Sequence, residues 1–159
     1  MRVWKFGDDI NTDIITPGRY TVTTDRERLA KIAFIEYRPE FSEKVRKGDI
    51  IVAGKNFGCG SSREHSPIAI KAAGVEAILA ENFARIFFRN AINIGLPIYI
   101  SPDVDKFDDG DEIEADYNAG IIKNKTKNLE VHVKPLPEFV QKIVEAGGLI
   151  GYLKGDGYV

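Results

Sequence analysis

Residues 49–100 constrain the fold most, because three short apolar runs alternate there with two segments of helical character. The apolar runs are DIIVA, VEAILA and LPIYI, whose lengths are typical of buried strands. Between them, SPIAIKAAG and NFARIFFRNAINIG predict helices. Ser66 and Asn82 are suited to cap these helices at their N-termini, and Gly74 and Gly95 are suited to end them. Strand, helix, strand, helix, strand is the pattern of a parallel sheet with right-handed crossovers.

The segments on either side of this region predict a smaller set of elements. Residues 3–6 predict a short strand and residues 7–20 a polar loop, and a helix is expected to begin after Asp25. Beyond Ser101, the segments DEIEADY, GIIK and NLEVHV alternate as in a small antiparallel meander. A last helix, LPEFVQKIVEAGG, is expected to end at its pair of glycines. The predicted fold class is therefore α/β, a parallel sheet with a small antiparallel β meander in one domain over residues 1–159.

Composition excludes several classes of function. The 159 residues carry 22 basic and 24 acidic side chains, which are mixed along the chain, so no basic block indicates nucleic-acid binding. No apolar run approaches the ~20 residues that a membrane span requires. The N-terminal MRVWKFGDDI lacks the charged-then-apolar pattern of a signal peptide. We therefore expect that the protein binds neither nucleic acid nor a membrane.

The inventory of metal ligands is short. One cysteine, Cys59, cannot form an internal disulfide, so a reduced, cytoplasmic location is expected. With one cysteine and two histidines, the chain cannot hold a four-cysteine zinc site or an iron–sulfur cluster. We therefore expect no metal bound by this chain. If the chemistry requires a metal cluster, another chain must carry it.

The segment NFGCGSSREHSP, residues 56–67, is the candidate site. It follows a predicted buried strand and opens a helix, and ligands of parallel sheets bind beyond the carboxyl ends of the strands. Ser61 and Ser62 offer hydroxyl groups there, and Arg63 offers a two-pronged donor that matches a carboxylate. A helix N-terminus adds unpaired N–H groups and about half a positive charge. The segment is suited to bind an anion, a carboxylate or a phosphate.

A purely structural role for this segment is also possible, and two common catalytic or binding motifs are absent from it. A glycine-rich turn with a serine cap also serves a structural role alone, and both roles stay open on these residues. The phosphate-loop pattern Gly-x-x-x-x-Gly-Lys-Ser/Thr is absent. A serine hydrolase lacks its Gly-x-Ser-x-Gly elbow here, and His65 lies only four residues beyond Ser61. Cys59 fits a small space-filling residue better than a reactive thiol.

Four segments together are recognisable as a family pattern. GKNFGCGSSREH, followed by AENFARIFFRNAINIGLPI, resembles the small subunits of 3-isopropylmalate dehydratase, in the aconitase superfamily. GDDINTDIITPGRY near the start and EAGGLIGYLK near the end are similar to the same small-subunit pattern. The resemblance covers nearly the whole chain.

The resemblance implies a fold, a partner and a reaction. The implied fold is a three-layer β/β/α swivelling domain, and a separate large subunit would carry a 4Fe–4S cluster in a heterodimer or heterotetramer. The implied reaction is the dehydration and rehydration that interconverts 2-isopropylmalate and 3-isopropylmalate in leucine biosynthesis, with activity only in the presence of the large subunit. By the same resemblance Ser61 is the general base, Ser62 and Arg63 grip a substrate carboxylate, and Asp13 is an active-site acid that orients its neighbours.

The resemblance also assigns the loop RYTVTT to recognition of the variable substituent on the substrate. The loop residues expected to bind substrate are Arg19, Tyr20, Thr21, Val22 and Thr23. Relatives that take the extra carboxylate of homoaconitate tend to show Tyr-Leu-Arg-Thr here, whereas Val22 suits an isopropyl group. Arg19 is long enough to reach a carboxylate, so a homoaconitase or dual-specificity small subunit stays open. For Val22, the alternative to substrate contact is that its side chain packs under the loop. For the chain as a whole, a further alternative is a non-catalytic carboxylate-binding module.

Two arginines on the second predicted helix have a less specific pattern. Arg85 and Arg89 lie four residues apart, so they share one face of the helix. Contact with substrate or with the large subunit is one interpretation. A solvated face is the one that the sequence favours.

Overall fold

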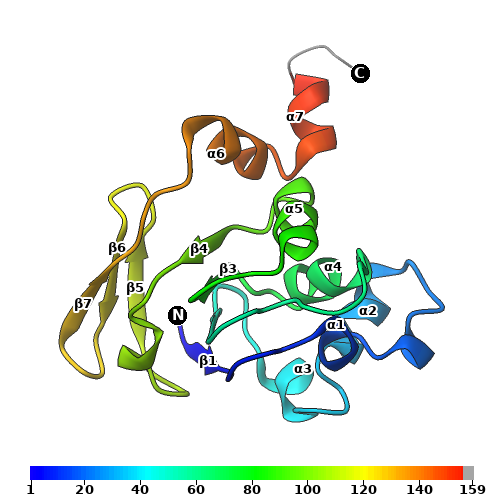
Figure 1. The fold of residues 1–159 in the computed structure, drawn as a ribbon, viewed down its shortest axis with the longest axis horizontal. Coiled ribbons are helices and arrows are strands. Elements are labelled where there is room, and N and C mark those ends of the chain that lie inside the picture. Colours follow the sequence, from blue (N-terminus) through cyan, green and yellow to red (C-terminus); the bar gives the residue numbers. More distant parts are fainter. Residues whose placement is uncertain (156–159) are drawn as a thin grey trace.

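The computed structural model describes residues 1–155, whose strands and helices fall largely where the sequence predicts them (Figure 1). The strands are β1 (Val3–Lys5), β2 (Ile50–Ala53), β3 (Ala77–Ala80), β4 (Ile98–Ile100), β5 (Ile113–Asp116), β6 (Ile121–Asn124) and β7 (Leu129–His132). The helices are α1 (Thr12–Ile15), α2 (Arg26–Ile32), α3 (Glu40–Lys44), α4 (His65–Ala72), α5 (Arg85–Asn93), α6 (Glu138–Glu145) and α7 (Leu149–Gly155). Two short 3₁₀ helices span Gly18–Tyr20 and Val104–Lys106. The expected domain over residues 1–159 includes four residues outside the described range.

Two sheets form, and both confirm the predicted pattern. The first is parallel throughout, in the order β1-β2-β3-β4, and the second is an antiparallel meander in the order β5-β6-β7. Ile50 pairs with Val3 on one side and with Ala77 on the other. None of the helices within residues 1–155 is long and apolar enough to cross a membrane.

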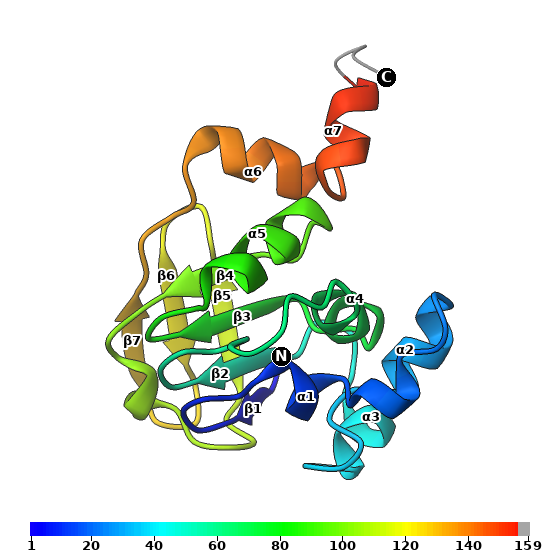
Figure 2. The same ribbon diagram turned by 45° about the vertical axis from the view of Figure 1, so that its right-hand side comes forward.

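The parallel sheet separates two hydrophobic cores, which gives the molecule three layers. Side chains on a strand alternate between faces, so Ile51 and Ala53 pack under the helices, whereas Ile50 and Val52 pack against the antiparallel sheet. Figures 1 and 2 show β5–β7 on one side of the parallel sheet and α4 and α5 on the other. The observed layers therefore confirm the predicted β/β/α arrangement, while the swivelling motion stays a prediction.

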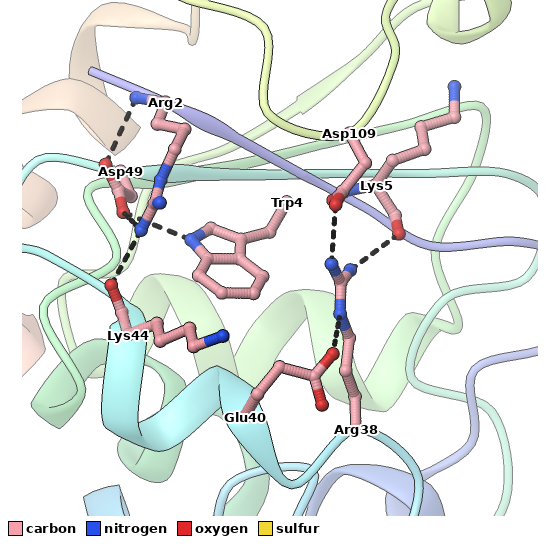
Figure 3. A network of polar contacts seen from close by, with 8 residues as sticks. All are labelled: Arg2, Trp4, Lys5, Arg38, Glu40, Lys44, Asp49 and Asp109. Atoms are coloured by element: carbon pink, nitrogen blue, oxygen red, sulfur yellow. Dashed lines mark hydrogen bonds and ion pairs between the residues drawn. The ribbon is translucent and has the colours of Figure 1, made fainter.

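A polar network fixes the edge strand β1 to the segments around it (Figure 3). The indole N–H of Trp4 donates to the buried carboxylate of Asp49 at 3.1 Å. Arg38 lies over the Trp4 ring, 4.6 Å from its centroid, and donates to Asp109 at 2.6 Å. These contacts join β1 to the turn before β2 and to the loop before β5.

Two predicted helix caps are wrong, because tertiary contacts use both side chains. Helix α4 begins at His65, and the fully buried Ser66 places its hydroxyl oxygen 2.7 Å from that of Thr16. Helix α5 begins at Arg85, and the Asn82 side chain instead accepts from the backbone N–H of Asn56 at 2.6 Å. A buried hydroxyl requires a partner, and for Ser66 that partner comes from a distant segment.

The predicted glycine stops are confirmed, but three short helices have no sequence prediction. Gly74 and Gly95 have φ angles of 105° and 78°, as glycines that end helices commonly do. The predicted polar loop contains α1, because the Asn11 side chain accepts from the N–H of Ile14 and caps a short helix. Helices α3 and α7 are also unpredicted. They are too short for a clear helical period in the sequence.

Candidate active site

Three loops that leave the carboxyl ends of β1, β2 and β3 surround one pocket of about 290 Å³. Its walls are the start of α1, the glycine-rich turn after β2 and the first turns of α5. The lining residues are Thr12, Gly58, Gly60, Ser61, Ser62, Arg63, Ala84, Arg85, Ile86, Phe87 and Asn90. This position is the one that the parallel-sheet rule predicts for a ligand.

Gly58 allows the turn and α5 to approach each other. Its φ is 82°, and a Cβ atom at this position would lie 2.2 Å from the Phe87 side chain. Its N–H donates to the carbonyl of Ile10 at 2.7 Å. Only glycine both adopts this positive φ easily and leaves room for Phe87, so the two walls of the pocket depend on Gly58.

Thr12 holds the predicted base, Ser61, in place. Its hydroxyl donates to the Ser61 carbonyl at 2.9 Å and lies 3.3 Å from the Ser61 hydroxyl oxygen. Its N–H also donates to the carbonyl of Cys59 at 2.9 Å. Thr12 is 2% exposed, so this contact is fixed from inside the fold. The sequence prediction missed Thr12, although its position next to Asp13 was a usable signal.

Arg63 is held by α1 and the residues after it. Its guanidinium forms an ion pair with Asp13 and donates to the Thr16 carbonyl at 2.9 Å through the same nitrogen, Nη1. The other terminal nitrogen lies beside Gly18, where a Cβ atom would come within 3.2 Å. Asp13 thus lies where it can orient Arg63, and the second nitrogen stays available to a ligand.

The predicted substrate loop lies beside this pocket, but none of its five residues is part of the lining. Arg19 forms an ion pair with Glu36, and its guanidinium lies 5.1 Å from the Tyr20 ring centroid. Thr21 donates from its hydroxyl to the Gly18 carbonyl at 2.9 Å. Arg19 is therefore engaged with an acid of its own chain.

Val22 is the most exposed of the large hydrophobic residues within residues 1–155, at 89%. The next residue, Thr23, accepts from the N–H of Asp25 at 3.1 Å, just before α2. Val22 is therefore not packed under its loop, which removes the structural explanation that the sequence left open. Its apolar side chain is free to contact a substrate or a partner.

Helix α5 contributes one arginine for which the sequence left contact with substrate open, and two residues that the sequence did not indicate. Arg85, Ile86 and Asn90 all line it, whereas Arg89 does not. Arg85 and Arg89 are both exposed, as a solvated face predicts. The sequence places the two arginines on one face of a helix. Only the packing of α5 against the turn shows that Arg85 lines the pocket and that Arg89 does not.

The chain's own side chains do not fit an iron–sulfur cluster. Among residues 1–155 no three His, Cys, Asp or Glu side chains come together as metal ligands. The single cysteine is half-buried, and burial together with the charge of Asp9 raises the pKa of the Cys59 thiol. A raised thiol pKa disfavours the thiolate that metals and electrophiles require. The partial burial of Cys59 agrees with the space-filling role that the sequence predicts.

Comparisons with known proteins give one consistent result. Residues 8–103 match the aconitase C-terminal domain family. The 3-isopropylmalate dehydratase small subunit 1 of Archaeoglobus fulgidus is 57% identical over 153 residues, which cover 96% of this chain and 95% of the relative. The small subunit of Caldicellulosiruptor saccharolyticus is 58% identical, over 96% of this chain and 88% of the relative.

A solved structure agrees with the sequence relatives. The crystal structure of 3-isopropylmalate dehydratase from Methanocaldococcus jannaschii superposes with a TM-score of 0.94 at 46% identity. The match covers 98% of this chain and 93% of that chain. The relatives and the solved structure match nearly the whole chain, and the family model matches residues 8–103 within it. The chain belongs to the family of 3-isopropylmalate dehydratase small subunits and contains the aconitase C-terminal domain.

Proposed function

We propose that this chain is the small subunit of a 3-isopropylmalate dehydratase. With a large subunit it interconverts 2-isopropylmalate and 3-isopropylmalate by dehydration and rehydration, a step of leucine biosynthesis in the cytoplasm. The observation that carries the proposal is that Ser61, Ser62 and Arg63 all line one pocket at the carboxyl edge of the parallel sheet. The relatives' names supply the identity of the substrate.

Ser61 acts as the general base in this proposal. Its hydroxyl oxygen takes the proton from the substrate carbon next to a carboxylate and returns a proton in the hydration step. A serine oxygen is a weak base unless positive charge and hydrogen-bond donors stabilise its deprotonated form. The guanidinium of Arg63 in the same pocket supplies positive charge for that stabilisation, whereas the Thr12 hydroxyl, which donates its proton to the Ser61 carbonyl, fixes the position of Ser61.

Ser62 and Arg63 hold a substrate carboxylate. Arginine presents parallel N–H groups that match the two oxygens of a carboxylate. Asp13 and the Thr16 carbonyl fix one side of the Arg63 guanidinium, so that the other side keeps a constant direction. Positioning of this kind lowers the barrier because the reacting carbon is held close to the base. Asp13 is therefore a positioning residue.

The large subunit supplies the iron–sulfur cluster. This chain does not provide ligands for it, since Cys59 is its only cysteine. Any cluster that acts on the substrate would therefore be held by residues of the large subunit. The small subunit alone is expected to be inactive.

Substrate selection by an apolar contact is part of the proposal. Val22 offers an exposed apolar surface for the isopropyl group, and Arg19 is already paired with Glu36. Both observations favour an isopropyl substituent over the extra carboxylate of homocitrate. A homoaconitase or dual-specificity role is correspondingly disfavoured.

Reconstitution tests the proposal directly. The purified chain is mixed with a cluster-bearing large subunit under anaerobic conditions, and turnover of 2-isopropylmalate and of homocitrate is measured. We expect conversion of 2-isopropylmalate by the pair and by neither subunit alone. If the pair converts homocitrate and leaves 2-isopropylmalate unchanged, the substrate assignment is wrong. If it converts neither acid while the chain alone binds carboxylates, the chain is a binding module.

A further inference from the structure

The pocket lining carries two positive charges and no negative one. Arg63 and Arg85 are its charged residues, and none of the lining side chains is a carboxylate. The two arginines come from different elements, the turn before α4 and the first turn of α5. A pocket with this charge is suited to an anion that bears two negative groups.

The two arginines differ in how their charges are satisfied. Arg63 has an ion pair with Asp13 and a hydrogen bond to the Thr16 carbonyl. The guanidinium of Arg85 has no acidic or carbonyl partner within residues 1–155. An unpaired arginine in the wall of a pocket is available to a ligand, whereas Arg63 is already partly neutralised.

The surroundings of Arg85 favour a carboxylate that belongs to a small organic acid. The first turn of α5 lines the pocket beside it, with N–H groups that have no partner within the helix. Asn90, one turn further on, adds an amide group, and Ile86 adds an exposed apolar surface. A volume of about 290 Å³ suits a small metabolite.

We propose that Arg85 binds the second carboxylate of the substrate, while Ser62 and Arg63 hold the first. The identity of the substrate in this inference rests on the proposed function. A dicarboxylate bound at two points cannot rotate about either contact, so the carbon that loses its proton stays beside Ser61. Arg85 is thus a substrate-binding residue and not part of a solvated helix face.

Arg85→Gln, Arg85→Lys and a matched control, Arg89→Gln, test the inference in the reconstituted enzyme. Arg89 lies on the same helix and is exposed, but it does not line the pocket. At saturating large subunit, we expect Arg85→Gln to raise KM for 2-isopropylmalate by ~10- to 100-fold, as for loss of a charged hydrogen bond. Arg85→Lys keeps the charge and should recover part of the loss, and Arg89→Gln should match the wild type.

The alternative role for Arg85 is a contact with the large subunit. In that case Arg85→Gln would raise the concentration of large subunit that gives half-maximal activity and leave KM unchanged. That result overturns the inference. So would an unchanged KM together with an unchanged affinity for the partner.

Direct binding separates this inference from the proposed function. The isolated chain is titrated with 2-isopropylmalate and followed by NMR, and the unfolding midpoint of each variant is checked. We expect Arg85→Gln to bind ~10-fold more weakly than the wild type or Arg89→Gln. If Arg85→Gln weakens binding in this way but the wild-type chain is inactive when paired with the large subunit, the proposed function is refuted and the role of Arg85 in binding is retained. Equal binding by all three chains, with an active pair and an unchanged KM, would refute the role of Arg85 alone.

Discussion

The hydroxyl oxygens of Thr12 and Ser61 lie 3.3 Å apart, although 49 positions separate the two residues in the chain. Thr12 is buried at the start of α1, and Ser61 is exposed in the turn after β2. The contact fixes an exposed side chain, the predicted base, to the interior of the fold.

Ser61→Ala should abolish most of the turnover with little effect on stability. Removal of a general base typically costs ~100- to 10,000-fold in rate, whereas Ser61 is exposed and its loss leaves no cavity. The reconstituted pair is assayed for turnover, and thermal unfolding is followed by circular dichroism. Ser42→Ala, outside the pocket lining, is the control. Turnover within a few-fold of the wild type would remove Ser61 from the role of base.

Val22→Arg should shift substrate preference toward acids with a third carboxylate. The side chain is 89% exposed, so the fold should tolerate the longer arginine. The ratio of kcat/KM for homocitrate to that for 2-isopropylmalate is measured and should rise by up to ~5-fold, which corresponds to the ~1 kcal/mol of one exposed ion pair with favourable geometry. Ile150→Arg, which adds the same charge at an exposed position on α7, serves as the control. An unchanged ratio would show that this loop does not contact the substituent.

Gly58→Ala should destabilise the protein by about 3 kcal/mol or more. The alanine would have to adopt a φ of 82°, and its Cβ would lie 2.2 Å from the Phe87 side chain. The costs of backbone strain and of overpacking therefore add in the free energy of unfolding. Denaturant unfolding measures the loss. Gly7→Ala is a matched control, because a Cβ there would meet nothing within 4 Å. Equal midpoints for the two variants would mean that α5 moves away from the turn at little cost.

Arg38→Met should destabilise the protein, and the loss should be greatest near neutral pH. Burial is the largest single effect and acts to raise the pKa of Asp109. The hydrogen bonds from Arg38 and from the backbone N–H of Lys5, together with nearby arginine charges, outweigh it, so the pKa of Asp109 lies below its usual value. A carboxylate with a lowered pKa stabilises the fold above the unfolded value of about 4 and loses this effect as the pH falls.

The difference in unfolding free energy between wild type and Arg38→Met should therefore shrink as the pH falls below about 4. Urea unfolding at several pH values measures it. The control is Arg28→Met, since Arg28 is exposed on α2 and its side chain has no partner within residues 1–155. A difference that does not change with pH would assign the stabilisation to the packing of Arg38 over Trp4.

Stability should also fall at alkaline pH because of Tyr99. Burial, together with the charge of Glu76, raises the pKa of Tyr99 to about 12. An unfolded tyrosine has a pKa of about 10, so the unfolded chain loses its proton first and stability declines between these two values. Unfolding free energy is measured across this range, with tyrosinate absorbance as the second signal.

Tyr99→Phe should reduce the slope of this alkaline decline. It should not remove the slope, because burial also raises the pKa of Tyr117, which stacks on Tyr99 at 4.9 Å between ring centroids. A decline of the same steepness in both proteins would show that Tyr99 ionises equally in the folded and unfolded states.

The sequence alone determined the parallel sheet, the antiparallel meander and the turn that carries Ser61. Apolar strand runs, alternation and glycine stops are local signals, so they can be recognised without knowledge of the tertiary structure. The motif around Ser61 also identified the family, which the comparisons confirm. Local signals failed at Ser66 and Asn82, whose polar groups bond to distant segments and not to their own helices.

Only the tertiary structure decided which residues share the pocket with Ser61. Thr12 and Arg85 lie 49 residues before it and 24 residues after it, and neither local pattern shows that the side chain lies against the turn. They meet because loops from the carboxyl ends of three adjacent parallel strands must emerge at the same edge of the sheet. Strand order and the close approach of α5 at Gly58 are consequences of packing, which depends on contacts across the whole chain.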